Sequence, residues 1–197
     1  MVKTRPAPPV ALAADLSVRD RILATACRLF YAEGIQAVGI QRIIDEAGIA
    51  KASLYAHFAS KDELVAAYLD AKGKGLRDAA AAHLANPRLS ARAKILKFFD
   101  MMVSAAEAPA FRGCAFQNAG AEVADRDHPI RVAARQQREW LHGVFTSLAR
   151  EVAGAAGAER LAGSLIVLYD GAAATTVIDG NPAAARHARW AAEKMLG

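Results

Sequence analysis

The sequence predicts an all-α protein, and three observations lead to that class. Alanine, a strong helix former, supplies much of a hydrophobic content that reaches 54% of the 197 residues. Extended runs of valine, isoleucine, threonine and aromatic residues, which are typical of strands, are missing. Apolar residues instead recur at helical spacing along most of the chain. Only 23% of the residues are charged, so the chain has enough apolar surface to bury a substantial core.

The chain begins with a segment that we expect to be a mobile arm. Residues 1–16 contain three prolines and show no helical periodicity. Lys3 and Arg5 give this arm two positive charges. Ser17 then has an acidic residue three positions later, which is the spacing of a capping box, and the first helix is predicted from there to Gly34.

Three further short helices are predicted in quick succession. The second covers residues 40–47 and is ended by Gly48, and the third covers residues 51–58. Ser60, with Glu63 at the capping-box position, then begins a fourth helix. The pattern lengthens beyond residue 85, and Gly180-Asn181-Pro182 is typical of a stop and a restart. Longer helices are predicted over roughly 90–106, 114–124, 129–153, 158–179 and 182–196.

The stretch from residue 40 to residue 64 has the succession of short helices and tight turn that a helix-turn-helix requires. A first short helix supports a second one, the glycine between them permits a tight turn, and a capped helix follows directly. Apolar side chains at fixed positions would lock the angle between the two helices. These residues are Ile44, Ala47, Ile49, Leu54 and Phe58.

The side chains left for the outer face suit a DNA groove. Ala52 and Ser53 are small enough to approach a thymine methyl group or a base edge, and Lys51 can reach a guanine or a phosphate. Taken singly, such residues are most often packing residues or solvated charges, and it is their joint order that favours DNA. The net charge of +5 permits a polyanionic partner without identifying one. The candidate DNA-contacting residues are Gln41, Arg42, Lys51, Ala52, Ser53, Tyr55, His57 and Lys61.

Residues 17–64 resemble the DNA-binding domain of the TetR family of transcription factors. The resemblance rests on Leu29–Gly34, Ile43–Ile49, Ser53–Phe58 and Ser60–Leu64. It implies that residues 17–64 form a three-helix helix-turn-helix domain that binds double-stranded operator DNA. It also implies that the DNA contacts come from Lys51, Ala52, Tyr55, His57 and Lys61.

The sequence departs from the family pattern at two positions. Members usually carry serine or threonine near Gly39 and near Ala50, where a hydroxyl can cap a helix and bond a phosphate. We therefore expect weaker caps on the second and third helices.

Residues 65–197 resemble the family more loosely, through Arg112–Ala119, Asp127–Pro129 and Asp170–Ala172. The resemblance implies a helical bundle for ligand binding and homodimerisation. Few basic residues lie in its aromatic segments, so we expect a small apolar or aromatic effector, although each aromatic residue is individually more typical of a core. The candidate ligand-binding residues are Phe98, Met102, Phe111, Phe116, Gln117, Asn118, Trp140, Tyr169 and Asp170.

Two apolar stripes near the C-terminus are candidates for the dimer interface. An intrachain core would produce the same stripes, so the assignment depends on the resemblance. One stripe consists of Leu161, Leu165, Leu168 and Ala172, and the other of Ala184, Ala188, Ala191 and Met195.

Other chemistry is weakly supported. Cys27 and Cys114 make neither a disulfide framework nor a metal motif, and Cys114 as a redox or electrophile sensor is a minor alternative. Asp125, Asp127 and His128 are better interpreted as caps around Pro129 than as metal ligands. We expect no cofactor, no metal and no enzymatic activity, because no nucleophile elbow, phosphate loop or zinc spacing is found.

The function predicted from the sequence is a ligand-responsive transcriptional regulator, most simply a repressor that a small effector releases from a palindromic operator. The start has no apolar secretory stretch and no purely apolar run spans a bilayer, so a cytoplasmic protein without membrane contact is expected. An architectural DNA-binding protein without an effector, or a helical small-molecule carrier, remains the alternative.

Overall fold

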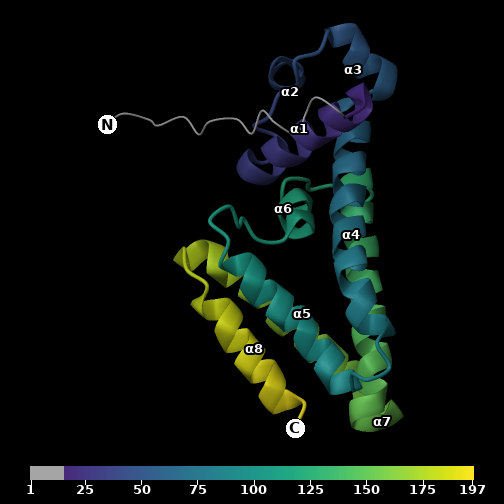
Figure 1. Ribbon diagram of the computed structural model, residues 1–197, viewed down its shortest axis with the longest axis vertical. Helices are drawn as coiled ribbons and strands as arrows, with labels where there is room; N and C mark the ends of the chain where they lie inside the picture. The colour runs from purple at the N-terminus through teal and green to yellow at the C-terminus, as the bar shows by residue number, and fades with distance from the viewer. Residues whose placement is uncertain (1–15) are drawn as a thin grey trace. The chain divides into compact units, whose positions relative to one another are not determined.

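The computed structural model describes residues 16–197, and every regular element within that range is a helix (Figure 1). The predicted all-α class is confirmed. The predicted arm, with Lys3 and Arg5, lies outside the described residues except for Leu16. The helices are α1 (Val18–Glu33), α2 (Ile40–Ala47), α3 (Lys51–His57), α4 (Lys61–Ala85), α5 (Ala91–Ala106), α6 (Ala115–Ala121), α7 (Pro129–Asp179) and α8 (Ala183–Met195).

The chain divides into two compact units, Met1–Tyr68 and Leu69–Gly197, and the boundary falls inside α4. The first unit is held together by a single apolar core, to which α1, α2, α3 and the start of α4 all contribute. Within it, the rings of Phe30 and Tyr68 meet edge to face with their centroids 5.7 Å apart. The buried residues of this core include Ile22, Ala26, Leu29, Phe30, Ile43, Ile44, Leu54, Phe58, Leu64, Val65 and Tyr68.

Local hydrogen bonds at the helix starts confirm the predicted caps. The Oγ of Ser17 accepts from the Asp20 N–H at 3.1 Å at the start of α1. The Oγ of Ser60 accepts from the Glu63 N–H at 3.1 Å, and the Glu63 carboxylate reaches back to accept from the Ala59 N–H at 2.7 Å. These bonds satisfy backbone donors that have no partner inside the helix, so they set where α1 and α4 begin.

The expected weakness at the other two starts is confirmed as well. α2 begins after Gly39 and α3 begins after Ala50, and neither residue makes a side-chain capping bond. Ala50 already has the extended conformation of a capping residue, with φ −76° and ψ 149°.

We predict that Ala50→Ser stabilises the protein by about 1 kcal/mol, because the new hydroxyl can accept from a free N–H in the first turn of α3. Urea denaturation followed by circular dichroism would measure the change. Ala56→Ser, at an exposed position inside α3, is the matched control and should cost about 0.5 kcal/mol through helix propensity. Equal effects of the two substitutions would contradict the prediction.

The second unit is built around α5, α7 and α8, with α5 and α8 running side by side (Figure 1). An aromatic cluster lies at its centre. The ring of Phe145 meets Phe98 edge to face at 5.3 Å and lies parallel to Phe99 at 6.3 Å between centroids. All three side chains are fully buried, so this cluster fixes α5 against α7.

The long helix α7 differs from its prediction in one respect. Two helices were predicted over 129–153 and 158–179, whereas the structure joins them into one 51-residue element interrupted only at Gly154. Gly154 has φ 70° and ψ 172°, a conformation that only glycine adopts without strain, so one residue replaces the expected connection.

By length and composition α7 is also long and apolar enough to cross a membrane, with an 18-residue window of mean hydropathy 1.6. The core helix of a helical bundle passes the same test, but only 33% of this window is buried within the chain. Part of its apolar surface is therefore left without cover.

Candidate nucleic-acid interface and ligand-binding region

The turn between α2 and α3 has the geometry that a helix-turn-helix needs. Gly48 ends α2 in the left-handed region, with φ 63° and ψ 45°, and its N–H bonds the Ile44 and Asp45 carbonyls. Leu54 and Phe58 then turn one side of the α3 segment into the core, with exposed fractions of 0% and 1%. The predicted set of locking residues is confirmed, with Ile49 half-buried and the others buried.

Because one side of α3 is buried, the other side faces outward. Lys51, Ala52, Tyr55 and His57 are all exposed there, and the Tyr55 side chain is 46% exposed. Ser53 and Lys61 are half-buried, and Lys61 lies in the first turn of α4. Apart from Ser53, the α3 residues that the sequence analysis selected are thus all exposed.

The two candidates on α2 are exposed but already bonded within the chain. The amide of Gln41 donates to Asp45 at 2.9 Å. The Arg42 guanidinium donates to Glu33 at 2.7 Å and to Glu46 at 2.9 Å, and these bonds, Glu33 first, raise the pKa of Arg42. Arg42 therefore ties the end of α1 to α2. A phosphate contact would use its remaining N–H groups.

A further arginine that the sequence analysis did not select joins this network. Arg28 on α1 pairs with Glu46, and together with Arg42 it holds the pKa of Glu46 below its ordinary value. The carboxylate thus stays ionised between two guanidinium groups and orders the surface beside the turn. Spacing could not reveal this pair, because Arg28 and Glu46 lie on different helices.

In the second unit, several candidate ligand residues belong to a continuous aromatic and sulfur-containing region. Phe98 and Met102 are buried in the core, and Trp140 meets Phe98 edge to face at 6.4 Å. Tyr169 lies edge to face with Phe99 at 5.6 Å, and burial raises the pKa of its hydroxyl. Phe111 packs partly buried against the adjoining cluster. These side chains pack together in the core of the second unit and at its margin.

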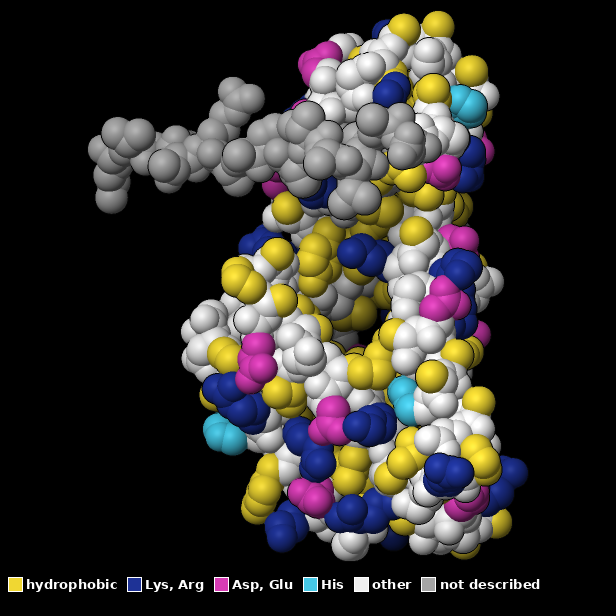
Figure 2. Space-filling view, viewed as in Figure 1, with side chains coloured by type: hydrophobic (Ala, Val, Ile, Leu, Met, Phe, Trp, Pro, Cys, Tyr) yellow, Lys and Arg dark blue, Asp and Glu magenta, His cyan; other side chains and the backbone are white. Residues whose placement is uncertain are grey.

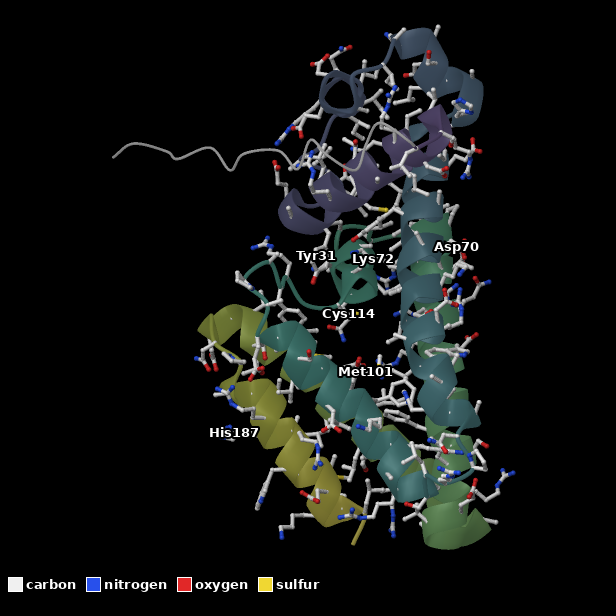
Figure 3. The ribbon with its side chains drawn as sticks, viewed as in Figure 1. Tyr31, Asp70, Lys72, Met101, Cys114 and His187 are labelled. Atoms are coloured by element: carbon white, nitrogen blue, oxygen red, sulfur yellow. The ribbon has the colours of Figure 1, made fainter. Side chains whose placement is uncertain are left out.

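Figure 2 shows a hollow in the second unit beside α4, below α6 and above α5, with hydrophobic side chains around it. Figure 3 labels Met101 of α5 and Cys114, the N-cap of α6, in this region. Phe116 and Gln117 on α6 are half-buried. Cys114 packs beside the same cluster as Tyr169.

The polar candidates are less available than the sequence suggested. Asn118 is exposed and donates to the Arg112 carbonyl at 2.7 Å, so it supports the loop before α6. Asp170 pairs with Arg138 across α7. Gln137, which the sequence analysis missed, is 92% buried and lies on the stripe of α7 that also carries Leu141 and Phe145. A glutamine at a core-facing position of an amphipathic helix was the signal that could have found it.

Of the three residues before α7 that were predicted as caps, His128 is confirmed as one. His128 is the N-cap of α7 and accepts from the Ile130 N–H at 3.3 Å, with Pro129 following at the first helical position. Asp125 accepts from the Asp127 N–H at 2.9 Å. Among residues 16–197, no group of three or more His, Cys, Asp or Glu side chains is placed to hold a metal.

The predicted dimer stripes are wrong in part. Leu165, Ala172 and Ala188 are buried within their own chain, so they cannot form an intermolecular surface. Leu161 and Leu168 pack partly buried against the same core. Helical periodicity identified the apolar sides of these helices but not which side the chain itself covers. The large apolar side chains that stay exposed on α7 and α8 are Val167, Val177, Ile178, Trp190 and Met195.

A helix-turn-helix with an exposed reading face, followed by a separate all-helical unit, defines a DNA-binding transcriptional regulator. Residues 22–68 match the family of bacterial regulatory proteins of the tetR type, and residues 91–192 match the tetracyclin repressor-like C-terminal domain. The chain belongs to the TetR family of transcriptional regulators, whose members bind operator DNA as dimers and are not enzymes.

Individual relatives agree with the family. A TetR-family transcriptional regulator from Streptomyces coelicolor is 37% identical with a TM-score of 0.85, and the match covers 91% of this chain and 94% of that one. The HTH-type transcriptional activator FasR of Mycolicibacterium smegmatis is 38% identical over 88 residues. YerO of Bacillus subtilis, an uncharacterized HTH-type transcriptional regulator, is 45% identical over 47 residues. These two matches cover 43% and 24% of this chain but only 40% of FasR and 16% of YerO.

We predict that Lys51→Ala weakens operator binding by roughly tenfold and lowers the slope of log affinity against log salt by about one per subunit, because it removes an exposed cation that we expect to contact a DNA phosphate. Fluorescence anisotropy across a salt series would measure both. Lys74→Ala is the matched control, since it removes the same charge from an exposed site on α4 where Lys74 pairs with Asp78. A loss of the same size in both variants would contradict a specific role for Lys51.

Proposed function

We propose that this chain is a repressor that binds a palindromic operator as a homodimer and is released from it by a small aromatic effector in the cytoplasm. The observation that carries the proposal is the orientation of α3. Lys51, Ala52 and Tyr55 are exposed on a helix that follows a glycine turn and is held in place by the burial of Leu54 and Phe58. Together with Gln41, Arg42, Ser53, His57 and Lys61, these residues would form the DNA-contacting surface.

The surface proposed for dimerisation is the exposed apolar side of α7 and α8. Ile178 is 82% exposed, Val167 68% and Trp190 62%, which is uncommon for such large apolar side chains. Gly171 and Ala174 lie between Val167 and Ile178 on the same side of α7 and are also exposed, so a partner helix can approach closely there. A shallow groove continues this surface toward α8. Its lining includes Gly163, Ser164, Val167, Leu168 and Met195.

We predict that the double variant Val167→Glu, Ile178→Glu is monomeric and binds the operator weakly, because two carboxylates from each subunit would have to be buried at the interface. Sedimentation velocity and anisotropy would measure the two effects. Val18→Glu, which changes another exposed valine on α1 of the first unit, is the control and should remain dimeric. A double variant that sediments like the unaltered protein would place the interface elsewhere.

The proposed effector occupies the aromatic region of the second unit. Phe111, Phe116, Trp140 and Tyr169 are only partly buried there, so they can wall a ligand without leaving the core. The helix α4 contains the boundary between the two units and carries residues of both. A ligand that favours one arrangement of α4 would thus change the population of DNA-binding dimers.

The sign of regulation has one competing candidate, because the relative FasR is described as an activator. A reporter gene under the operator distinguishes the two. Deletion of the regulator should raise expression if it represses and lower expression if it activates.

The experiment that tests the proposed function is anisotropy of the purified protein on DNA from upstream of its own gene, against scrambled DNA of equal composition. We predict selective binding that weakens steeply with salt. Equal affinity for both DNAs would favour an architectural role or an operator elsewhere. No binding at low salt would contradict DNA recognition and favour a small-molecule carrier.

A further inference from the structure

In the buried side-chain amide of Gln137, the oxygen has a hydrogen-bond partner and the nitrogen has none. The Oε1 of Gln137 accepts from Nη1 of Arg77 at 3.0 Å. Because a guanidinium only donates, the carbonyl end of the amide must face Arg77, and this fixes which end is Nε2. The Nε2 of Gln137 is buried and has no hydrogen-bond partner. A buried donor in that state costs stability, so the free protein holds an unsatisfied group at this point.

This amide lies where three helices meet. A Cβ atom added to Gly73 on α4 would lie 2.8 Å from the Gln137 Oε1, 2.9 Å from Nη1 of Arg77 and 3.4 Å from Cζ of Phe116. The polar pair from α4 and α7 is therefore bordered by an aromatic ring from α6. Because Gly73 has no side chain, Arg77 and Gln137 can occupy the space beside it.

The positive charge of Arg77 beside the Gln137 amide restricts which ligand groups can bind there. Arg77 and the free amide nitrogen both donate, and the guanidinium would repel an ammonium group. The nearest carboxylate, Asp70, lies 3.7 Å from Arg77 with its side chain 80% exposed, so solvent screens it. An acceptor oxygen suits this pair better than a donor or a purely apolar group.

We propose that the Gln137 amide and Arg77 bind a carbonyl or carboxylate oxygen of the aromatic effector, which makes the effector an aryl compound with one acceptor group. The inference rests on the proposed effector response and deepens it. The ring of Phe116 moves aside to admit the oxygen, since Nε2 is closed to solvent in this structure. α6, which carries Phe116, has seven residues and no side-chain cap at its N-terminus.

A regulatory ligand must bind one arrangement of the protein more tightly than another, and the unsatisfied Gln137 amide provides such a difference. The hydrogen bond to Nε2 exists only in the liganded protein, so the ligand favours the arrangement in which α6 has moved. Arg77 lies on α4, the helix that contains the boundary between the two units. Ligand binding that alters the hydrogen bond between Arg77 and Gln137 would therefore also affect α4.

The experiment measures the affinity of three probes for the full-length dimer by ligand-observed NMR titration. Acetophenone carries a carbonyl, benzoate carries a carboxylate, and ethylbenzene has the shape of acetophenone without its oxygen. We expect both oxygen-bearing probes to bind the unaltered protein about tenfold more tightly than ethylbenzene. Gln137→Met should remove this preference and leave ethylbenzene within about twofold. Gln136→Met, at the exposed neighbouring position of α7, is the matched control and should preserve the preference.

Arg77→Met is the second variant, and it tests the proposed oxygen-binding site if Gln137→Met does not fold. It should weaken benzoate more than acetophenone, because it removes the cation as well as a donor. Equal affinity of the three probes, or a preference that survives both variants, overturns the inference. Operator binding of the same samples separates the two failures. Selective DNA binding with no probe preference refutes only this inference, whereas DNA binding without selectivity in the unaltered protein refutes the proposed function.

Discussion

The proposed DNA-contacting surface depends on the burial of Leu54 and Phe58, because these two side chains set the rotation of the α3 segment about its axis. Leu54 is fully buried, and the ring of Phe58 lies in the core under the guanidinium of Arg19, 5.0 Å from the ring centroid. α3 has seven residues and no side-chain cap, so it has little stability of its own. Tertiary packing therefore holds both the helix and its orientation. A helix held in this way presents the opposite side chains at defined positions, as readout of a groove requires.

The ion pairs around Glu46 also help to fix the positions of helices in the first unit. Arg28 and Arg42 converge on this one carboxylate from α1 and α2, while Arg42 also bonds Glu33. Each exposed pair contributes little by itself, but charges arranged in a network restrain the relative positions of the helices they join. Two positive side chains are thus kept at the edge of the proposed DNA-contacting surface, where Glu33 and Glu46 offset their charge.

The second unit combines a tightly packed aromatic core with a less complete margin. Phe98 and Phe99 are fully buried against Phe145, whereas Phe116 and Trp140 remain half-buried and Gln137 keeps an unsatisfied donor. Complete burial stabilises a fold, but a region that must admit a ligand has to leave some contacts unmade. Phe116 of α6 borders the Gln137 amide, and a short helix without a side-chain cap at its N-terminus is the kind of element that opens at low cost.

The sequence alone determined the features that depend on near neighbours along the chain. The all-α class, the starts of α1, α4 and α7 at Ser17, Ser60 and His128, and the turn at Gly48 follow from periodicity and from capping residues that act within one helical turn. The exposure of Ala52 could be predicted for the same reason, since the spacing of Leu54 and Phe58 indicates which side of the third helix is buried and Ala52 lies on the other side.

Only the tertiary structure decided the partners of groups far apart in the sequence. It pairs Arg42 with Glu33, Asp170 with Arg138 and Gln137 with Arg77, and spacing in the sequence does not encode contacts between different helices or distant turns. It also divides the apolar residues of α7 and α8 into those that face the chain, such as Leu165 and Ala188, and those that face outward, such as Ile178. Periodicity shows that a helix has an apolar side, but how wide that side is and what covers it depend on how the whole unit packs.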